Sequence, residues 1–257
     1  MYHREKRIDL HYSLIKKNVT TPEAVYIAFP FRMPGAEVLY EAHGGIVYPG
    51  KNQLEGTSSD WHTVQNFLAV RGPRGQIVLG SREVPLMQLG GLNLGKFRYI
   101  AEVEKPHAFS WVMNNYWVTN FRASQEGEFR WNYFLTSSRN SSNSFATRAG
   151  WGSRIPLLCR VFPPGKSSKI APERSLLRID ADNVLLVSTK PSADTKGIIL
   201  HLRELEGKPA DVRVYAAGEM GKRRSLVEVN VLGEAISVPS QSIRMEAWES
   251  KFVRLEF

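Results

Sequence analysis

The sequence contains a single cysteine, Cys159, among its 257 residues. This excludes a disulfide framework and a cysteine-only zinc site within one chain. Because Cys159 sits in the apolar run PLLCRVF, we expect a buried, unreactive thiol. No apolar run approaches the ~20 residues that a membrane-spanning helix needs. The opening stretch, MYHREKRIDLHYSLIKK, is charged and carries no apolar core of the kind found in secretion signals. These absences predict a soluble protein without a signal peptide, most simply a cytoplasmic one.

Motifs of the common catalytic and metal sites are also missing. The six histidines form no H-x-D, H-x-H or H-E-x-x-H pattern, so we predict no sequence-local zinc site. There is no G-x-S-x-G nucleophile elbow and no G-x-x-x-x-G-K-[ST] phosphate loop. We therefore assign no catalytic residue and no metal ligand from motifs alone.

The overall composition is that of a globular protein, with 42% hydrophobic and 23% charged residues. The net charge of +9 raises the question of nucleic-acid binding. However, the lysines and arginines are spread along the whole chain and not gathered in one patch. We expect no nucleic-acid partner and no membrane partner.

Strand-like segments dominate the sequence and predict an all-β protein. Short runs of β-branched and aromatic residues recur every 8–14 residues, separated by turns rich in Gly, Pro, Asn and Asp. This spacing is typical of antiparallel β-sandwiches. The predicted strands are Ile8–Ile15, Ala24–Phe31, Val64–Val70, Gln76–Leu79, Arg98–Val103, Phe109–Met113, Phe129–Leu135, Ser175–Ile179, Val184–Ser188, Gly197–Leu205, Asp211–Ala216, Leu226–Val231 and Ile243–Trp248.

Two other segments bear on the organisation of the chain. Ser138–Gly150 has N-cap residues and a closing glycine, which predicts one short helix. Phe162–Glu173 reads FPPGKSSKIAPE, a composition typical of a linker. We therefore predict a large β-sandwich over residues 1–166 and a smaller β-sandwich domain over residues 167–257.

Aromatic and amide side chains concentrate in two segments. One is SWVMNNYWVTNFR at Ser110–Arg122, and the other is GTSSDWHTVQNF at Gly56–Phe67. Aromatic faces stack on the C–H side of sugar rings, while Asn, Asp and Gln hold hydroxyl groups. The same mixture also suits a sandwich core with polar loops. Both interpretations, and single-stranded nucleic acid as a distant third, remain open at this point.

These segments resemble the C-terminal region of family 38 glycoside hydrolases, the α-mannosidases, and most closely the bacterial branch. The resemblance rests on EAVYIAFPF (Glu23–Phe31), QLEGTSSDWHTVQNF (Gln53–Phe67), VPLMQLGGL (Val84–Leu92) and MNNYWVTNF (Met113–Phe121), in that order. DADNVLLVSTKPSADTKGIILHLRELEG (Asp180–Gly207) and the ending IRMEAWESKFVRLEF resemble the family's small terminal β-domain. The resemblance covers nearly the whole chain, from about Arg7 to Phe257.

The resemblance implies part of a mutarotase-like supersandwich followed by a small terminal β-domain. It also implies a missing catalytic domain, because nothing here matches the family's zinc site or its nucleophile. The reaction, retaining hydrolysis of α-mannosides with zinc on the sugar hydroxyls, would belong to a parent or partner polypeptide. The chain alone would be inactive, hold no cofactor and share the parent's compartment.

The same resemblance implies which residues would help to wall a substrate pocket. These candidate substrate-binding residues are Asp60, Trp61, Gln65, Asn114, Asn115, Trp117 and Asn120. Trp117 would stack on or wall the pocket, while Asp60 and Asn120 would hold hydroxyls or orient neighbours. The alternative is that these residues only join the sandwich to the catalytic domain.

The expected partners are an α-mannoside or another glycan, and a catalytic domain of the same or a second polypeptide. An uncovered domain interface would expose apolar patches and favour self-association. Two rival hypotheses stay open: a stand-alone carbohydrate-binding protein, and a structural remnant of a truncated glycosidase.

Overall fold

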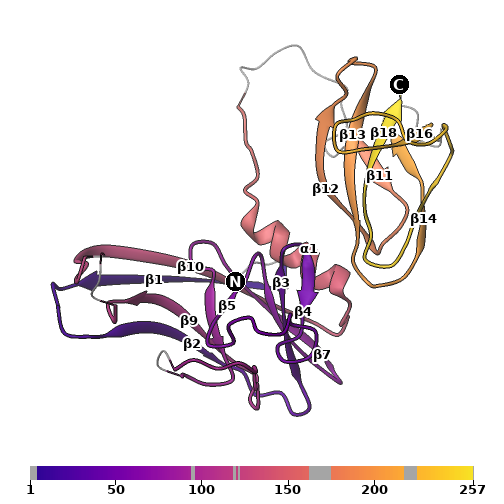
Figure 1. The fold of residues 1–257 in the computed structure, drawn as a ribbon. Helices are drawn as coiled ribbons and strands as arrows, with labels where there is room; N and C mark the ends of the chain where they lie inside the picture. Colours follow the sequence, from indigo (N-terminus) through magenta and orange to yellow (C-terminus); the bar gives the residue numbers. More distant parts are fainter. Residues whose placement is uncertain are drawn as a thin grey trace. The chain divides into compact units, whose positions relative to one another are not determined.

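The computed structural model describes residues 5–93, 96–117, 120, 122–161, 175–216 and 225–256 (Figure 1). The chain forms two compact units, Met1–Leu157 and Leu158–Phe257. The predicted linker Phe162–Glu173, and with it the predicted boundary between residues 166 and 167, lies outside the described residues.

The N-terminal unit is a sandwich of two antiparallel sheets. One sheet contains β1 (Arg7–Lys16), β10 (Gly127–Ser138), β7 (Gly75–Ser81), β6 (Leu68–Gly72), β3 (Glu37–Ala42) and β4 (Gly45–Val47), in that order across the sheet. The other contains β2 (Ala24–Pro30), β9 (His107–Asn114), β8 (Leu86–Leu89) and β5 (His62–Thr63). Apolar side chains from both sheets, such as Leu79 and Met87, share one buried core. The prediction of an all-β chain built on antiparallel sheets is confirmed.

Two buried polar contacts lie inside this core. The hydroxyls of Ser110 on β9 and Tyr133 on β10 are hydrogen-bonded at 2.8 Å and so connect the two sheets. His62 on β5 lies 3.2 Å from the hydroxyl of Tyr40 on β3, measured from its Nδ1 atom. Burial lowers the pKa of His62 to about 4, because the charged imidazolium is poorly solvated in the core.

A single described helix, α1 (Asn143–Arg154), covers the outer face of the six-stranded sheet. Its N-cap is Ser142, whose side chain accepts a hydrogen bond from the backbone N–H of Phe145. The helix was predicted to close at Gly150, yet it continues to Arg154. Gly150 does not end the helix but allows it to pack closely against Phe67, since a Cβ at position 150 would lie 2.7 Å from the Cβ of Phe67. A Cβ at Gly152, by contrast, would meet nothing within 4 Å.

The C-terminal unit is a second, smaller β-structure. Its four-stranded sheet contains β12 (Val184–Pro191), β13 (Gly197–Glu204), β18 (Ser250–Glu256) and β16 (Leu226–Val229), in that order. Two short pairs accompany it, β11 (Leu177–Ile179) with β15 (Val214–Ala216), and β14 (Ala210–Val212) with β17 (Ile243–Met245). Apolar residues from all these strands form one core.

A buried carboxylate organises two turns of this unit. Glu204, at the end of β13, is 1% exposed and accepts hydrogen bonds from the backbone N–H groups of Glu206, Gly207 and Trp248 at 2.7–2.8 Å. The Asn183 amide adds a fourth at 2.9 Å. Burial by itself raises the pKa of this carboxyl, but the hydrogen bonds outweigh it and hold the pKa below its usual range.

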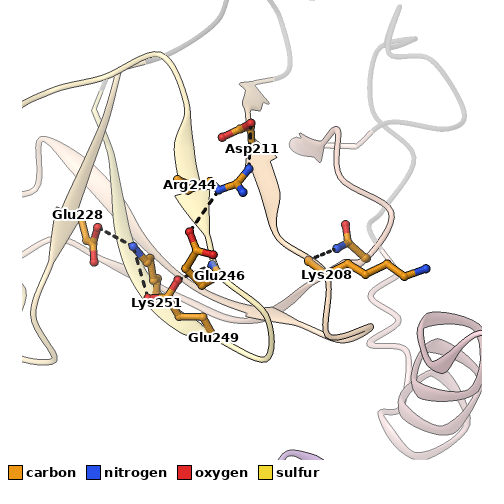
Figure 2. Close-up of polar contacts among 8 residues, drawn as sticks. Lys208, Asp211, Glu228, Arg244, Glu246, Glu249 and Lys251 are labelled. Atoms are coloured by element: carbon orange, nitrogen blue, oxygen red, sulfur yellow. Dashed lines mark hydrogen bonds and ion pairs between the residues drawn. The ribbon is translucent and has the colours of Figure 1, made fainter.

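The C-terminal unit also contains ion pairs, which range from exposed to partly buried. Figure 2 shows Arg244 between Asp211 and Glu246, with N–O distances of 3.3 Å to each. Lys251 lies between Glu228 and Glu249 at 3.1 and 3.5 Å. The Arg244 pairs are exposed, and such pairs contribute about 0–1 kcal/mol each to stability. The Lys251 side chain is only 16% exposed, so its two pairs are less screened by solvent than those of Arg244.

Two further sequence expectations are wrong. Arg98–Val103 is not a strand, and Tyr99 and Ile100 are largely exposed. A strand there would have one apolar face, formed by Tyr99, Ala101 and Val103. Of these only Val103 packs against the core, so the segment has no apolar surface to cover as a strand. Cys159 is exposed rather than buried, because the segment after α1 forms no strand and packs little: Leu157 and Leu158 are 98% and 95% exposed.

No helix within the described part of the chain has the length and apolar character to cross a membrane.

We predict that Glu204→Gln lowers the free energy of unfolding of the C-terminal unit by about 3 kcal/mol, since hydrogen bonds to a charged group contribute about 1.5–3 kcal/mol each. The new amide would also face backbone N–H groups that need an acceptor. Glu246→Gln is the matched control, because that side chain is exposed, and should change stability by no more than about 0.5 kcal/mol. Urea unfolding of both variants measures the difference; equal effects would contradict the assigned role.

A second prediction concerns pH. His62 has a folded-state pKa of about 4, below the ~6.5 of an unfolded histidine. The unfolded state therefore binds more protons between these values, and stability falls as the pH falls. We expect the N-terminal unit to lose about 2 kcal/mol between pH 7 and pH 5. His62→Phe should reduce the change in the free energy of unfolding between pH 7 and pH 5, as measured by urea unfolding at several pH values. An unchanged slope would exclude His62 as its source.

Candidate functional site

The candidate site lies on the outer face of the four-stranded sheet of the N-terminal unit. Ser110 points into the core toward Tyr133. Since successive side chains of a strand point to opposite faces, the next residue, Trp111, points away from the core. The same alternation on β8 buries Met87 and Leu89 in the core and places Gln88 on the outer face.

Five aromatic side chains gather on this face, and we call them the aromatic cluster: Tyr26, Trp61, Trp111, Tyr116 and Trp117. Trp111 is the centre, with ring centroids 5.7 Å from Tyr26, 5.4 Å from Trp61, 6.2 Å from Tyr116 and 5.9 Å from Trp117. Tyr26 stacks on Trp111 at an interplanar angle of 15°, and Trp61 meets it edge-on at 62°. These are favoured aromatic geometries.

The cluster runs from the interior to the surface. Trp111 is 4% exposed, whereas Trp117 is 48% exposed. Trp117 also contacts Trp61, with centroids 6.0 Å apart, so the exposed ring is held by two others. A held, half-exposed indole offers a ready surface for stacking against the C–H face of a sugar ring.

Beside the cluster lies a chain of buried polar groups, which we call the amide chain: Gln88, Asn93 and Asp60. Gln88 Nε2 donates to Asn93 Oδ1 at 2.7 Å. Asn93 Nδ2 in turn lies 3.0 Å from the backbone oxygen and 3.3 Å from the Oδ1 of Asp60. All three residues are buried, so their hydrogen bonds hold the loop that carries Trp61 against β8.

Some buried polar atoms of this face have no hydrogen-bond partner among the described residues. They are the Trp111 indole N–H, the Tyr26 hydroxyl and the Gln88 Oε1 atom. Burial raises the pKa of Tyr26 to about 12, and the nearby Tyr116 adds to this shift as a smaller cause. The Tyr26 hydroxyl therefore stays protonated at neutral pH. Buried polar groups usually find a partner, so these atoms are available to hydrogen-bond water or a ligand.

The side-chain amide of Asn115 is hydrogen-bonded to the backbone of neighbouring loops. Its Oδ1 accepts from the backbone N–H of Glu23 at 2.6 Å. Its Nδ2 lies 3.0–3.2 Å from three backbone oxygens, those of Val19, Thr21 and Ala123. Both ends of the amide are therefore engaged within the chain, and Asn115 ties the loop before β2 to the turn after β9.

The remaining predicted residues lie in different surroundings. Asp60 is 4% exposed, which suits the orienting of neighbours. Asn114 is exposed and lines a hollow with Lys16 and Arg122. Gln65 is apart from the aromatic cluster: its Oε1 accepts from the backbone N–H of Gly44, in the turn between β3 and β4, at 3.1 Å.

The structure therefore brings Asp60, Trp61 and Trp117 to one place and leaves Gln65 elsewhere. Asn120 is exposed. Contact of these residues with a sugar stays a prediction.

Five residues of this face were not predicted from the sequence as site residues: Tyr26, Trp111, Tyr116, Gln88 and Asn93. The period-two alternation of side chains along β9 could have predicted that Trp111 lies on the outer face of the sheet. No local signal could have placed Tyr26, since it meets Trp111 only through the pairing of β2 with β9.

The described residues hold no cluster of three or more His, Cys, Asp or Glu side chains that could bind a metal ion. The most buried acid of the N-terminal unit, Glu41, is engaged in structural contacts. Its two carboxylate oxygens accept from the Asn66 amide at 2.7 Å and from the Trp151 indole of α1 at 3.0 Å.

We predict that Asn115→Asp destabilises the N-terminal unit by about 3 kcal/mol, because a carboxylate would face three backbone carbonyl oxygens with no donor. Asn114→Asp introduces the same charge one residue earlier at an exposed position. It should cost no more than about 0.5 kcal/mol. Thermal or urea unfolding of the two variants provides the comparison, and equal destabilisation would refute the structural role of Asn115.

Known protein families and curated proteins offer no match when compared with this sequence. Solved structures do match. One is a protein in glycosyl hydrolase family 38 from Enterococcus faecalis, and another is an alpha-mannosidase from Enterococcus faecalis V583. Both superpose with a TM-score of 0.75 at 12% sequence identity.

The match covers 100% of this chain but only 29% and 28% of those two chains. The chain therefore spans less than a third of the length of the proteins that it resembles in structure. At this level of identity the likeness establishes the fold and not the activity. The chain has the all-β fold of one part of a family 38 glycosidase chain.

Proposed function

We propose that this chain is the noncatalytic C-terminal β-sandwich region of an α-mannosidase-like glycoside hydrolase, and that it supports or completes a mannoside-binding site. The observation that carries the proposal is the structural match over the whole chain to one part of family 38 chains. The ordered sequence motifs give independent support, since they fall on the same family.

In this proposal the aromatic cluster is the surface that the chain contributes. Trp117 provides a stacking face, and Trp61 and Trp111 hold it in place. The amide chain positions the loop that carries Trp61. The Trp111 N–H and the Tyr26 hydroxyl supply hydrogen-bonding groups beneath this surface. The zinc ion and the carboxylates of the reaction belong to the polypeptide that carries the catalytic domain.

A second candidate is a stand-alone carbohydrate-binding protein. The half exposure of Trp117 favours it, because an aromatic face on the surface can bind a glycan without a partner. The two candidates differ in whether a catalytic polypeptide is needed.

The test adds this chain to the Enterococcus faecalis alpha-mannosidase truncated to remove the matched region. Hydrolysis of p-nitrophenyl α-D-mannopyranoside in the presence of zinc is then measured. In parallel, methyl α-D-mannopyranoside is titrated into the chain alone while its tryptophan indole signals are followed by NMR. We expect hydrolysis above that of the truncated enzyme.

Trp117→Ala should reduce the restored activity at least tenfold, since it removes the exposed stacking face. Trp248→Ala is the matched control, because Trp248 has a similar exposure of 55% and lies in the other unit. Mannoside binding without restored hydrolysis would favour the stand-alone candidate and overturn the supporting role. Neither binding nor restoration would overturn both.

A further inference from the structure

A hollow of about 280 Å³ lies on the face of the six-stranded sheet that also carries α1. Phe134 of β10 packs with Ala146 of α1, so its side chain points to this face. Asp9 of β1 and Gly80 of β7 lie directly opposite Phe134 on either side and share its face. The hollow lies over this row of three residues, beside Ser153 in the last turn of α1. Its volume is near the lower end of the range for small-molecule sites.

The floor of the hollow depends on a glycine. A Cβ at Gly80 would lie 1.8 Å from the Cε1 atom of Phe134, so the aromatic ring lies directly over the glycine. The Arg7 guanidinium lies over the same ring, 5.5 Å from its centroid, and the Nε atom of Arg7 is 2.6 Å from the Oδ1 atom of Asp9. Ring, guanidinium and carboxylate therefore hold one another in place at the bottom of the hollow.

Arg82 contributes a second guanidinium to the hollow. It follows β7 directly, and its Nε and Nη2 atoms each lie 3.3 Å from the backbone oxygen of Ser153. Cations are favoured at the C-terminal end of a helix, where the last carbonyl oxygens are unpaired. These two contacts fix the plane of the guanidinium, while its Nη1 atom has no hydrogen-bond partner among the described residues. The Nη1 group of Arg82 is thus available to a ligand.

His11 lines the same hollow, and its neighbours determine which ring nitrogen can meet a ligand. The Glu83 carboxylate accepts from the backbone N–H and the side-chain Nδ2 of Asn132, at 2.9 and 2.8 Å. Asn132 therefore presents its Oδ1 atom to His11 Nδ1, at 2.6 Å. An amide oxygen only accepts, so Nδ1 carries the proton. In the neutral imidazole Nε2 is then an acceptor, and no described residue is hydrogen-bonded to it.

The chemistry of these groups favours an oxyanion that can also donate a proton. Two guanidiniums and one carboxylate line the hollow, so its fixed charges are positive in sum. A phosphate monoester has a second pKa of about 6, so a fraction of it keeps one acidic O–H near neutral pH. That O–H can donate to His11 Nε2 while the other oxygens accept from Arg82. A carboxyl group, with a pKa of about 4, has lost its proton at this pH.

We propose that this hollow binds a small phosphate monoester, with Arg82 and His11 holding the phosphate group and Arg7 adding positive charge at the floor. The groups involved belong to β1, β10, the residues directly after β7 and the last turn of α1, and none of them precedes Arg7. The aromatic cluster lies on the other sheet of the sandwich. The two sites are separate, and binding at one does not require binding at the other.

The first test titrates glycerol 3-phosphate into the full chain in 150 mM NaCl, which screens weak contacts between exposed charges. Binding is measured by calorimetry and by the NMR signals of the imidazoles. We expect saturable binding that shifts the signals of His11 and leaves those of His201, in the C-terminal unit, in place. Acetate should bind more weakly, because it has no proton to donate. Inorganic phosphate should also bind more weakly, because it fills less of the hollow.

The results that would contradict the proposal are distinct. No saturable binding of glycerol 3-phosphate, or binding that leaves the His11 signals unchanged, would overturn the site. Equal or tighter binding of acetate would overturn the choice of phosphate over a carboxylate. Equal or tighter binding of inorganic phosphate would overturn the monoester as the ligand.

The second test uses variants. Arg82→Gln should weaken the binding of glycerol 3-phosphate at least about tenfold, because it removes a hydrogen bond between charged groups. Arg74→Gln is the matched control: it removes the same charge at an exposed position in the turn before β7, at the opposite end of that strand, and should change the affinity less than about twofold. His11→Ala should weaken binding as well. Circular dichroism confirms that each variant is folded, and equal effects of Arg82→Gln and Arg74→Gln would overturn the inference.

Discussion

The buried hydrogen bond between the hydroxyls of Ser110 and Tyr133 fixes the face to which every residue of β9 points. It lies where the two sheets of the N-terminal unit meet. With Ser110 directed into the core, Trp111 must lie on the outer face, and the aromatic cluster forms around it. A slip of one residue would move Trp111 into the core and expose Ser110. The candidate site is thus a consequence of strand register.

A second constraint acts through the loops. Asn115 and Asp60 were both attractive as sugar-binding residues because amides and carboxylates hold hydroxyl groups. In the structure each is hydrogen-bonded mainly to other parts of the chain. Asn115 and Asp60 therefore act on the conformation of the loops next to the aromatic cluster. The exposed ring of Trp117 depends on both, because Asn115 holds the segment that carries Trp117 and Asp60 belongs to the loop that carries its neighbour Trp61.

The sequence was sufficient for the fold class because the signal there is repetitive. Period-two alternation and regularly spaced turns recur along most of the chain, and the ordered motifs pointed to a family whose solved members share the fold. The site was harder to predict. Tyr26 and Trp111 are far apart in the sequence and meet only through strand pairing. Arg98–Val103 was misjudged because its composition and alternation suit a strand, while in the structure most of its apolar side chains do not pack on the core. Cys159 was misjudged because an apolar run usually packs, and this one does not.

The two glycines of α1 differ in the space around them, and this difference has a consequence for evolution. At Gly150 the helix approaches Phe67 so closely that any side chain would force the helix away from the sheet. At Gly152 the neighbouring space is open, and glycine there only weakens the helix. Selection for packing should therefore keep position 150 as glycine among related proteins, while position 152 is free to drift toward alanine or a polar residue. A comparison of positions 150 and 152 among related proteins would therefore distinguish a glycine that the fold requires from one that it does not.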